Sequence, residues 1–452
     1  MNAVARPPGP KSLHPLGQFL PFRRDVLGFL TQVAREHGDV AFFALGSIKV
    51  VLLSHPDHVR EVLTTHNRHV EKGRPLRLAK HLLGEGLLTS EGAFHARQSR
   101  IVSPVLHPQR LQGYGTIVTD YAERAHRTWR DGATVDMRDE MVRLAVAIAG
   151  KTMFHWEMDS GAAAGVQRAL DDALSIFDRV TVPFAELLLK IPLPGTRRFL
   201  RARAHLDAAI YGLIESRRRD GQDHGDLLSM LLAAQDSEGD GGRMTDKQVR
   251  DEALTLFLTA FDTVSLTLTW TWYVLAQHPE VETALHAELD RVLGGRTPTV
   301  DDLAKLPYLR MVITETLRLY PPAWATAREV CEEFSVGGYT MPVGTLILMS
   351  QWVVQRDPRW FANPEACLPE RWDHANDSRP PRFSYFPFGG GSRGCIGQNY
   401  GLQEAALIMA TMVQHWHVRL VAEKPVVLQP LINLRPRDGM PMILQQHAPL
   451  PA

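Results

Sequence analysis

The chain has 452 residues, of which 44% are hydrophobic, so it can build a core large enough to enclose a bulky ligand. Its 50 basic and 50 acidic residues give a formal net charge of +0, which excludes a general electrostatic attraction to nucleic acid or acidic membranes. Only three cysteines occur, Cys331, Cys367 and Cys395; so sparse and odd a set argues against a disulfide framework and fits a reducing cytosol.

Residues 1–20 predict an extended, proline-rich arm. Their sequence, MNAVARPPGPKSLHPLGQFL, lacks the roughly 20 apolar residues that span a bilayer and the charged-then-apolar order of a secretory signal. We therefore expect a soluble, cytoplasmic protein, a monomer with no membrane anchor and no nucleic-acid partner.

Beyond the arm, the pattern is mainly helical, with a small β portion near each end. Residues 39–56 hold two β-branched and aromatic runs on either side of Gly46, which predicts a hairpin, and residues 334–350 form a second strand-rich patch. Stretches rich in Gly and Asp at 218–226 and 236–242 predict loops between helices. Most of the remaining chain repeats its apolar residues with helical periodicity.

The longest predicted helix begins at Thr245 and is on the order of 50 Å long. Thr245 and Gln248 have capping-box spacing, and Pro279 supplies the stop. The middle of this helix is apolar nearly all round, so we expect it to run through the core. Within that core, Asp262 and Thr263 place an acid beside an alcohol.

The segment FPFGGGSRGCIG, residues 386–397, surrounds Cys395 with five glycines. A lone cysteine is usually a small buried hydrophobe. Here the glycines would let the backbone pack closely against a flat group, and the N-terminus of the helix predicted next would stabilise an anionic sulfur. A phosphate-binding loop is the alternative, but no Gly-Lys-Ser/Thr follows the glycines.

Two further motifs precede this loop. In ETLR, Glu315 and Arg318 lie three residues apart and share one helix face, and PERW offers Arg371 in a proline-punctuated loop. Each motif alone is typical of a solvated surface. In this order and together with FGGGSRGCIG, they make the chain resemble the cytochrome P-450 family of haem-thiolate monooxygenases, and the resemblance covers nearly the whole chain.

The resemblance implies the mainly α, triangular-prism fold of that family with a minor β region, as one domain over residues 1–452. It implies heme b with its iron bound by Cys395, whose thiolate favours O–O cleavage, and with Phe388 and Gly397 beside the haem. It also implies that the three charged residues of ETLR and PERW form a buried network behind the haem.

The family holds the two haem propionates with basic groups. Arg393 and Arg328 match those positions, and His95 stands where the family has Trp or His. The arginine expected four residues after His95 is replaced by Ser99. The next residue, Arg100, is therefore either a propionate ligand or a solvent-facing arginine.

The long apolar helix matches the oxygen-activating helix of the family with one departure. The usual Ala-Gly-x-Asp/Glu-Thr-Thr appears here as Thr259-Ala260-Phe261-Asp262-Thr263-Val264. The acid and the first alcohol are kept, so we expect the Thr263 hydroxyl to bond the carbonyl four residues back and, with Asp262, to deliver protons for oxygen activation. Thr259 either narrows the pocket or is purely structural.

These features imply a monooxygenase that inserts one oxygen atom from dioxygen into a C–H bond or adds it across C=C. Three cysteines are too few for a four-cysteine iron–sulfur cluster, so electrons come from separate proteins; in the soluble bacterial members these are commonly a ferredoxin and its reductase. The alternatives are a haem-thiolate peroxygenase or isomerase that does not use dioxygen, and a haem gas sensor.

The positions at which the family contacts substrate are mostly apolar here. They predict a lipophilic substrate: a terpenoid, a fatty acid or a steroid-like molecule. The candidate contacts are Leu78, Leu82, Leu83, Leu87, Phe257, Thr259, Phe261, Ala323, Trp324, Ala325, Leu431 and Ile432.

One further pattern involves histidine. His415 and His417 occupy alternate positions of a predicted strand and would share one face, as two metal ligands do. No third ligand lies nearby in the sequence, so the pattern predicts only a strand.

Overall fold

The computed structural model describes residues 6–12, 15–106, 108–157, 165–166, 168–170, 172–173, 191, 193–236, 241–373, 379–422 and 424–447. By their mutual contacts the residues divide into two compact units, each assembled from separate stretches of chain. Unit 1 comprises Met1–Arg74, Thr314–Cys395 and Leu428–Arg435, and unit 2 comprises Pro75–Ile313, Ile396–Val427 and Pro436–Ala452. The prediction of one domain over the whole chain stays a prediction.

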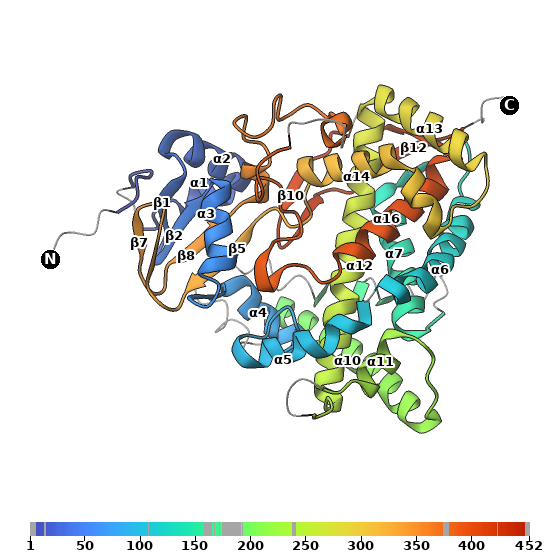
Figure 1. Cartoon of the computed structure of the whole chain (residues 1–452), viewed down its shortest axis with the longest axis horizontal. Helices are drawn as coiled ribbons and strands as arrows, with labels where there is room; N and C mark the ends of the chain where they lie inside the picture. Colours follow the sequence, from blue (N-terminus) through green and yellow to red (C-terminus); the bar gives the residue numbers. More distant parts are fainter. Residues whose placement is uncertain are drawn as a thin grey trace. The chain divides into compact units, whose positions relative to one another are not determined.

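Unit 1 is built from short helices and most of the strands (Figure 1). Its elements are α1 (Phe19–Arg24), α2 (Val26–His37), β1 (Val40–Leu45), β2 (Ile48–Leu53), α3 (Pro56–Arg60), the π-helix η1 (Glu61–Thr65), β3 (Val70–Lys72), β5 (Thr326–Val330), β6 (Phe334–Val336), β7 (Tyr339–Met341), β8 (Leu346–Met349), α15 (Gln351–Val354), η5 (Pro369–Trp372), η6 (Gly391–Arg393) and β10 (Leu428–Pro430).

A five-stranded sheet with the order β1-β2-β8-β5-β3 is the framework of unit 1, and β1 and β2 form the predicted hairpin. Side chains alternate along β2. Val50 and Leu52 pack in one apolar cluster with residues of α2, whereas Val51 and Leu53 pack in another with residues of α3 and η1. Because both faces of the sheet are covered, β2 is a continuous apolar run and not an alternating one.

The structure describes part of the predicted N-terminal arm, which stays a prediction. Residues 6–12 have no regular structure, and the Phe42 amide of β1 donates to the Pro8 carbonyl at 2.7 Å. The arm is shorter than predicted, because α1 begins at Phe19.

Unit 2 holds the long helices. Its elements are α5 (Gly92–Val102), η2 (Ser103–Leu106), α6 (Pro108–His126), β4 (Thr134–Asp136), α7 (Met137–Phe154), α10 (Pro194–Asp220), α11 (Leu227–Ala233), α12 (Asp246–Gln277), α13 (Pro279–Leu293), η4 (Val300–Lys305), α16 (Gln398–Val413), β9 (Trp416–Leu420) and β12 (Pro441–Gln446). Three elements begin in one unit and end in the other: α4 (Arg74–Leu83), α14 (Pro307–Leu319) and β11 (Leu434–Pro436).

The helix α12 follows its predicted boundaries. Thr245 caps its first turn through a capping box with Gln248, and Pro279 opens α13 just after its end. It packs against α7, α10, α11, α13 and α16 within unit 2 (Figure 1). Among the described residues it is the one helix long and apolar enough to cross a membrane, but 78% of its apolar window is buried, as in the core helix of a soluble protein.

The prediction of a mainly α fold with strands near each end is confirmed. Of the two predicted loops, the one at 218–226 begins late, because α10 continues to Asp220 and ends at Gly221 with a φ of 66°. Four residues of the other loop, 237–240, lie outside the described residues.

Candidate functional site

The loop that carries Cys395 is shaped by its glycines, and Cys395 is an exposed residue. Gly389 and Gly391 have φ values of 67° and 69°, in the left-handed region that other residues rarely adopt. A Cβ added to Gly391 would lie 1.9 Å from the Leu63 carbonyl oxygen, and one added to Gly390 would lie 2.3 Å from the Phe383 ring. Contact with the Leu63 backbone therefore requires glycine at Gly391, and a side chain at Gly390 would have to displace the Phe383 ring; the close approach of the loop to a flat ligand stays a prediction.

Backbone hydrogen bonds hold the loop closed behind the thiol. The Cys395 amide donates to the Phe388 carbonyl at 2.9 Å, and the Gly394 amide donates to the Gly391 carbonyl at 3.1 Å. Gly397 then precedes α16 as its N-cap residue. The thiol thus extends from a fixed turn directly before the N-terminus of a helix.

Glu315, Arg318 and Arg371 contact one another, as the resemblance implies. The two Glu315 oxygens accept from Arg318 at 2.8 and 2.9 Å, and Arg371 donates to Glu315 at 3.0 Å. The Trp372 indole and the Leu368 amide add hydrogen bonds to the same carboxylate at 2.8 and 3.0 Å. The Glu315 and Arg318 side chains are both 0% exposed, so the structure shows a buried and closely satisfied charge network.

Burial alone would raise the pKa of Glu315. Hydrogen bonds and charge from Arg318, followed by charge from Arg371, outweigh that effect and hold the pKa below its usual value. The carboxylate is therefore ionised at neutral pH, and its stabilising contribution depends on that charge.

Gln355 links this network to the cysteine loop, and sequence reasoning missed it. Its amide group donates to the carbonyls of Leu317 and Arg318 at 3.0 Å each, and its oxygen accepts from the Phe386 amide at 3.1 Å. Phe386 is the first residue of the loop segment. No local sequence signal marks this role, because the three partners come from distant parts of the chain.

Basic side chains gather at the strand pair β3 and β5. Arg328 is buried and lies opposite Lys72 in the antiparallel register, and Arg393 donates to the Val70 carbonyl at 2.9 Å. A basic side chain can pair with the carboxylate of a ligand through charge-assisted hydrogen bonds. Lys72, which sequence reasoning also missed, therefore joins Arg328 and Arg393 as a cation suited to a carboxylate such as a haem propionate.

The two candidate propionate ligands of unit 2, His95 and Arg100, differ in their surroundings. His95 lies on α5, half-buried, with its Nδ1 3.3 Å from the Ser90 hydroxyl. Arg100 is five positions further along this helix, so it does not share a face with His95. Its guanidinium donates to both oxygens of the buried Asp236 at 3.1 and 2.9 Å. Arg100 has a protein partner of its own, and we leave it out of the proposed haem site.

The middle of α12 has a partly exposed stripe. Thr259, Ala260, Asp262 and Thr263 are half-buried, whereas most residues around them are buried. The Thr263 hydroxyl donates to the Thr259 carbonyl at 2.8 Å, as expected. The same bond recurs along the helix, however, for instance from Thr271 to the Thr267 carbonyl at 2.7 Å. The partial exposure of Thr263, more than its back-bond, distinguishes it from Thr271, which is fully buried.

Two predicted substrate contacts on α12 lie on the wrong face. Phe257 and Phe261 are buried, and the Phe257 ring lies 5.5 Å from the ring of Phe154 on α7. At roughly 100° per residue they lie about 200° round the helix from Thr259 and Thr263. One ligand cannot face both pairs, so we withdraw Phe257 and Phe261 from the proposed site.

The other apolar candidates fall into two groups, one in each unit. In unit 1 the Trp324 indole donates to the Leu431 carbonyl at 2.9 Å, so the structure joins the turn 323–325 to the turn 431–432, and these five residues are half-buried. In unit 2, Leu78, Leu82 and Leu83 on α4 are fully buried, while Leu87 is half-buried.

The residues present fit a haem on two counts. The thiol of an exposed cysteine on a rigid turn is a suitable iron ligand. The cations Lys72, Arg328 and Arg393 suit the two carboxylates that a haem carries.

Comparison with known proteins gives a consistent result. A family model described as Cytochrome P450 matches residues 7–439. "Cyclooctatin synthase" of Streptomyces melanosporofaciens is 37% identical over 95% of this chain and 92% of its own. "Cyclooctat-9-en-7-ol 5-monooxygenase" of the same organism is 38% identical over 91% and 89%, and "Pentalenene oxygenase" of Streptomyces avermitilis is 31% identical over 94% and 95%.

A solved structure, "Retinoic acid bound cyanobacterial CYP120A1", superposes with a TM-score of 0.87 over 99% of this chain and 100% of its own. At 24% identity this likeness concerns the fold alone. It confirms the fold that the sequence predicts.

Replacing Glu315 by Gln should lower the free energy of unfolding by about 3–5 kcal/mol, because Arg318 and Arg371 would keep buried charges without their carboxylate. Denaturant unfolding at pH 7 measures this change. Glu215→Gln removes an exposed carboxylate paired with Arg219 and should change stability by no more than about 1 kcal/mol.

The difference between Glu315→Gln and the unsubstituted protein should also depend on pH. Because the pKa of Glu315 is lowered in the folded state, its contribution is present above the ordinary carboxyl pKa of about 4.3 and is lost as the pH falls below it. An equal difference at pH 7 and under acid conditions that leave the protein folded would contradict the ionic role.

Proposed function

Because this chain belongs to the cytochrome P450 family and is therefore an oxidoreductase of the monooxygenase type, we propose that it inserts one oxygen atom from dioxygen into a neutral, lipophilic terpenoid. The observation that carries the proposal is the exposed residue Cys395 on its closed glycine turn, within a chain matched by the family over residues 7–439.

We propose heme b as the cofactor, with Cys395 as its iron ligand and with Phe388 and Gly397 beside it. When bound, the haem supplies the activation of dioxygen, and a thiolate ligand favours O–O cleavage. Arg328, Arg393 and His95 would hold the propionates, and Lys72, opposite Arg328 in the strand register, adds a further basic group at this place.

Protons for the reaction would come through α12. The Thr263 hydroxyl is held by the Thr259 carbonyl, so its oxygen keeps a fixed position on the partly exposed stripe. Asp262 is the neighbouring half-buried acid on this stripe and would exchange protons with bulk water. Thr259 makes the same bond to the Thr255 carbonyl at 2.8 Å, so both roles predicted for Thr259 stay predictions.

The terpenoid class is favoured over fatty acids and steroids by two arguments. Close relatives bear names of terpenoid-modifying enzymes, "Cyclooctatin synthase" and "Pentalenene oxygenase". The remaining candidate contacts at Leu87, 323–325 and 431–432 are apolar side chains, which offer no cation to a carboxylate. Burying the carboxylate of a fatty acid among them would be unfavourable.

We propose that the electrons come from a ferredoxin and its reductase, since three cysteines cannot hold a four-cysteine cluster. The monomeric state and the cytoplasmic location expected from the sequence are proposals of the same kind.

Substitution of Cys395 by Ser should abolish the red-shifted absorbance band that ferrous haem–carbon monoxide shows with a thiolate ligand, because a serine oxygen does not donate charge as a thiolate does. Cys331→Ser and Cys367→Ser are matched controls, one exposed and one buried, and should keep the band. Retention of the band in Cys395→Ser, or its loss in a control, would refute the assignment.

Thr263→Ala should still bind haem and substrate. The amount of product formed per molecule of reduced electron donor consumed should fall by about tenfold, and the missing electrons should be recovered as peroxide. Thr271→Ala removes the same back-bond from a fully buried position of the same helix and should keep normal coupling. If both variants form the same amount of product per molecule of electron donor consumed, the hydroxyl of Thr263 has no special part in proton delivery. If the protein is a peroxygenase or an isomerase, neither variant will take up dioxygen when the reduced electron donor is added.

Titration of the haem absorbance with compounds of similar carbon number tests the substrate class. A neutral cyclic terpenoid should bind at least about tenfold tighter than a fatty acid or a steroid, a difference of roughly 1.4 kcal/mol. Tighter binding of the fatty acid would mean that a cation faces the substrate and would overturn the terpenoid proposal while leaving the haem assignment intact.

A further inference from the structure

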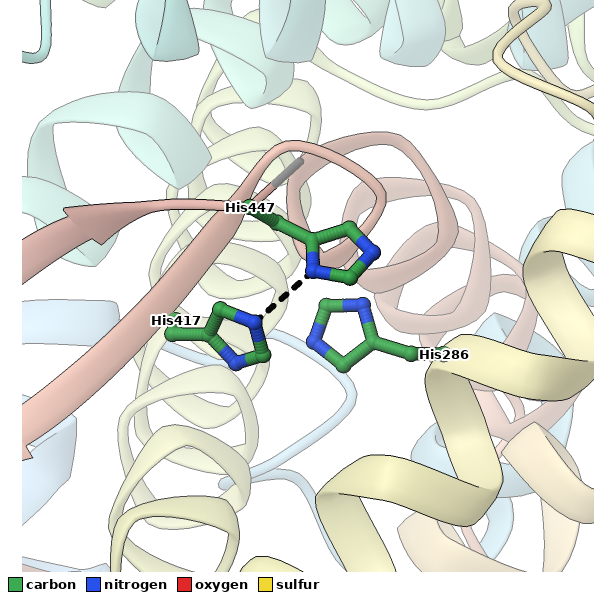
Figure 2. A group of neighbouring side chains, drawn as sticks. All are labelled: His286, His417 and His447. Carbon is green, nitrogen blue, oxygen red and sulfur yellow. Dashed lines mark hydrogen bonds between the residues drawn. The ribbon is translucent and has the colours of Figure 1, made fainter. Parts of the chain in front are cut away.

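Three histidines from separate segments meet within unit 2. His286 lies on α13, His417 on β9, and His447 directly follows β12 (Figure 2). The ring centroids of His286 lie 4.3 Å from His417 and 3.9 Å from His447, and the last two are 4.7 Å apart. One nitrogen from each ring lies within 4.8 Å of the others, so the three form a compact set of imidazole donors.

His286 gives the strongest evidence for a ligand at this cluster. It is 4% exposed, and neither of its ring nitrogens has a hydrogen-bond partner among the residues that the structure describes. Buried polar groups are normally hydrogen-bonded, and an imidazole without such bonds is unfavourable unless a ligand accepts its lone pair. Figure 2 shows the His286 ring facing the other two.

Two carboxylates lie behind the other rings. His417 Nδ1 is 3.2 Å from Glu282 Oε2, and His447 Nε2 is 3.9 Å from Asp290 Oδ2. The opposite nitrogens, His417 Nε2 and His447 Nδ1, are 2.8 Å apart. For His417 this is the arrangement of metal-binding histidines, in which a carboxylate orients the ring through one nitrogen while the other nitrogen binds the metal. The 3.9 Å between His447 and Asp290 is too long for a hydrogen bond.

We propose that His286, His417 and His447 bind one divalent transition-metal ion of the zinc type, with Glu282 orienting His417. Three imidazoles and a water complete a four-coordinate zinc site, and imidazole nitrogen is a preferred zinc ligand. Zinc–nitrogen bonds of about 2.0–2.1 Å at tetrahedral angles require the nitrogens to be about 3.3 Å apart. The 2.8 Å pair would have to open by roughly half an ångström, which a small rotation of the partly exposed His417 ring provides.

The protonation state agrees with this geometry. Burial, together with the neighbouring His447 and His417, lowers the pKa of His286 to about 3, and burial likewise lowers the pKa of His447. Both rings are therefore neutral at pH 7 and keep the lone pair that a metal needs.

A second cluster, Glu123, His126 and His415, does not have these features. The His126 and His415 rings are stacked with 14° between their planes, so their in-plane lone pairs run nearly parallel, whereas the His286 ring is inclined by 40° and 35° to the rings of His417 and His447. The Glu123 carboxylate already accepts from Arg127 and Thr297 at 3.1 and 2.9 Å. His415 and His417 thus belong to different clusters, and the sequence indeed offers no third ligand near them.

The metal would join three elements that are far apart in the sequence. β9 and β12 already pair, with His417 opposite Gln445, and the ion would fasten both to α13. A ligand that binds the folded state and not the unfolded chain raises thermal stability. This gives a readout that is independent of the haem reaction, so the inference does not depend on the proposed substrate.

The test uses the haem-loaded full chain, treated with a chelator and then dialysed against micromolar Zn²⁺. Elemental analysis should find one zinc per haem iron, and Zn²⁺ should raise the thermal midpoint of unfolding. His286→Ala and His417→Gln should each weaken zinc binding by about tenfold to a hundredfold or more and remove the thermal effect. His278→Ala, which removes an imidazole just before α13 and outside the cluster, should behave as the unsubstituted protein.

Absence of saturable zinc from the unsubstituted protein would overturn the proposal. So would zinc that remains at the same affinity in His286→Ala or His417→Gln, because the ion would then sit elsewhere. If His286→Ala does not fold, His417→Gln decides, since its side chain is 33% exposed and its loss leaves no buried cavity.

Discussion

The ionised carboxylate of Glu315 is the constraint on which unit 1 depends. Removed from water, it is stable only because Arg318, Arg371, Trp372 and Leu368 all bond to it. Arg318 in turn donates to three carbonyls of the segment 355–366. Because each charge needs every partner, α14, η5 and the chain between them are fixed as one body, and Gln355 extends that body to the beginning of the cysteine loop.

Much of this was readable in the sequence, for a physical reason. Helix caps such as Thr245 with Gln248 act over one turn, so their signal is local. The charged residues of ETLR and PERW and the cysteine loop occur in a fixed order, and a buried charge network tolerates few replacements. The fold, the long helix and the contacts of Glu315 could therefore be predicted.

What sequence could not provide was the tertiary surroundings of each residue. Lys72 is buried on a three-residue strand that pairs in register with β5, where it lies opposite Arg328. Gly390 and Gly391 are required by Phe383 and Leu63, which no spacing rule connects to them. Phe257 and Phe261 stand close to Thr259 and Thr263 in sequence, but the helical repeat places them on the buried side of α12, where the Phe257 ring packs on Phe154 of α7. The histidine cluster was hidden because its members are contributed by a helix, a strand and the residue after another strand.

The division into two units has a consequence for biosynthesis. The chain passes between the units after residues 74, 313, 395, 427 and 435, so neither unit is a continuous fragment. Residues 428–435 belong to unit 1, and β12, the central strand of a three-stranded sheet in unit 2, comes later still. Both units thus remain incomplete on the ribosome until the last part of the chain emerges. Such long-range closure slows folding and leaves apolar surface exposed meanwhile, which makes the nascent chain a natural client for chaperones.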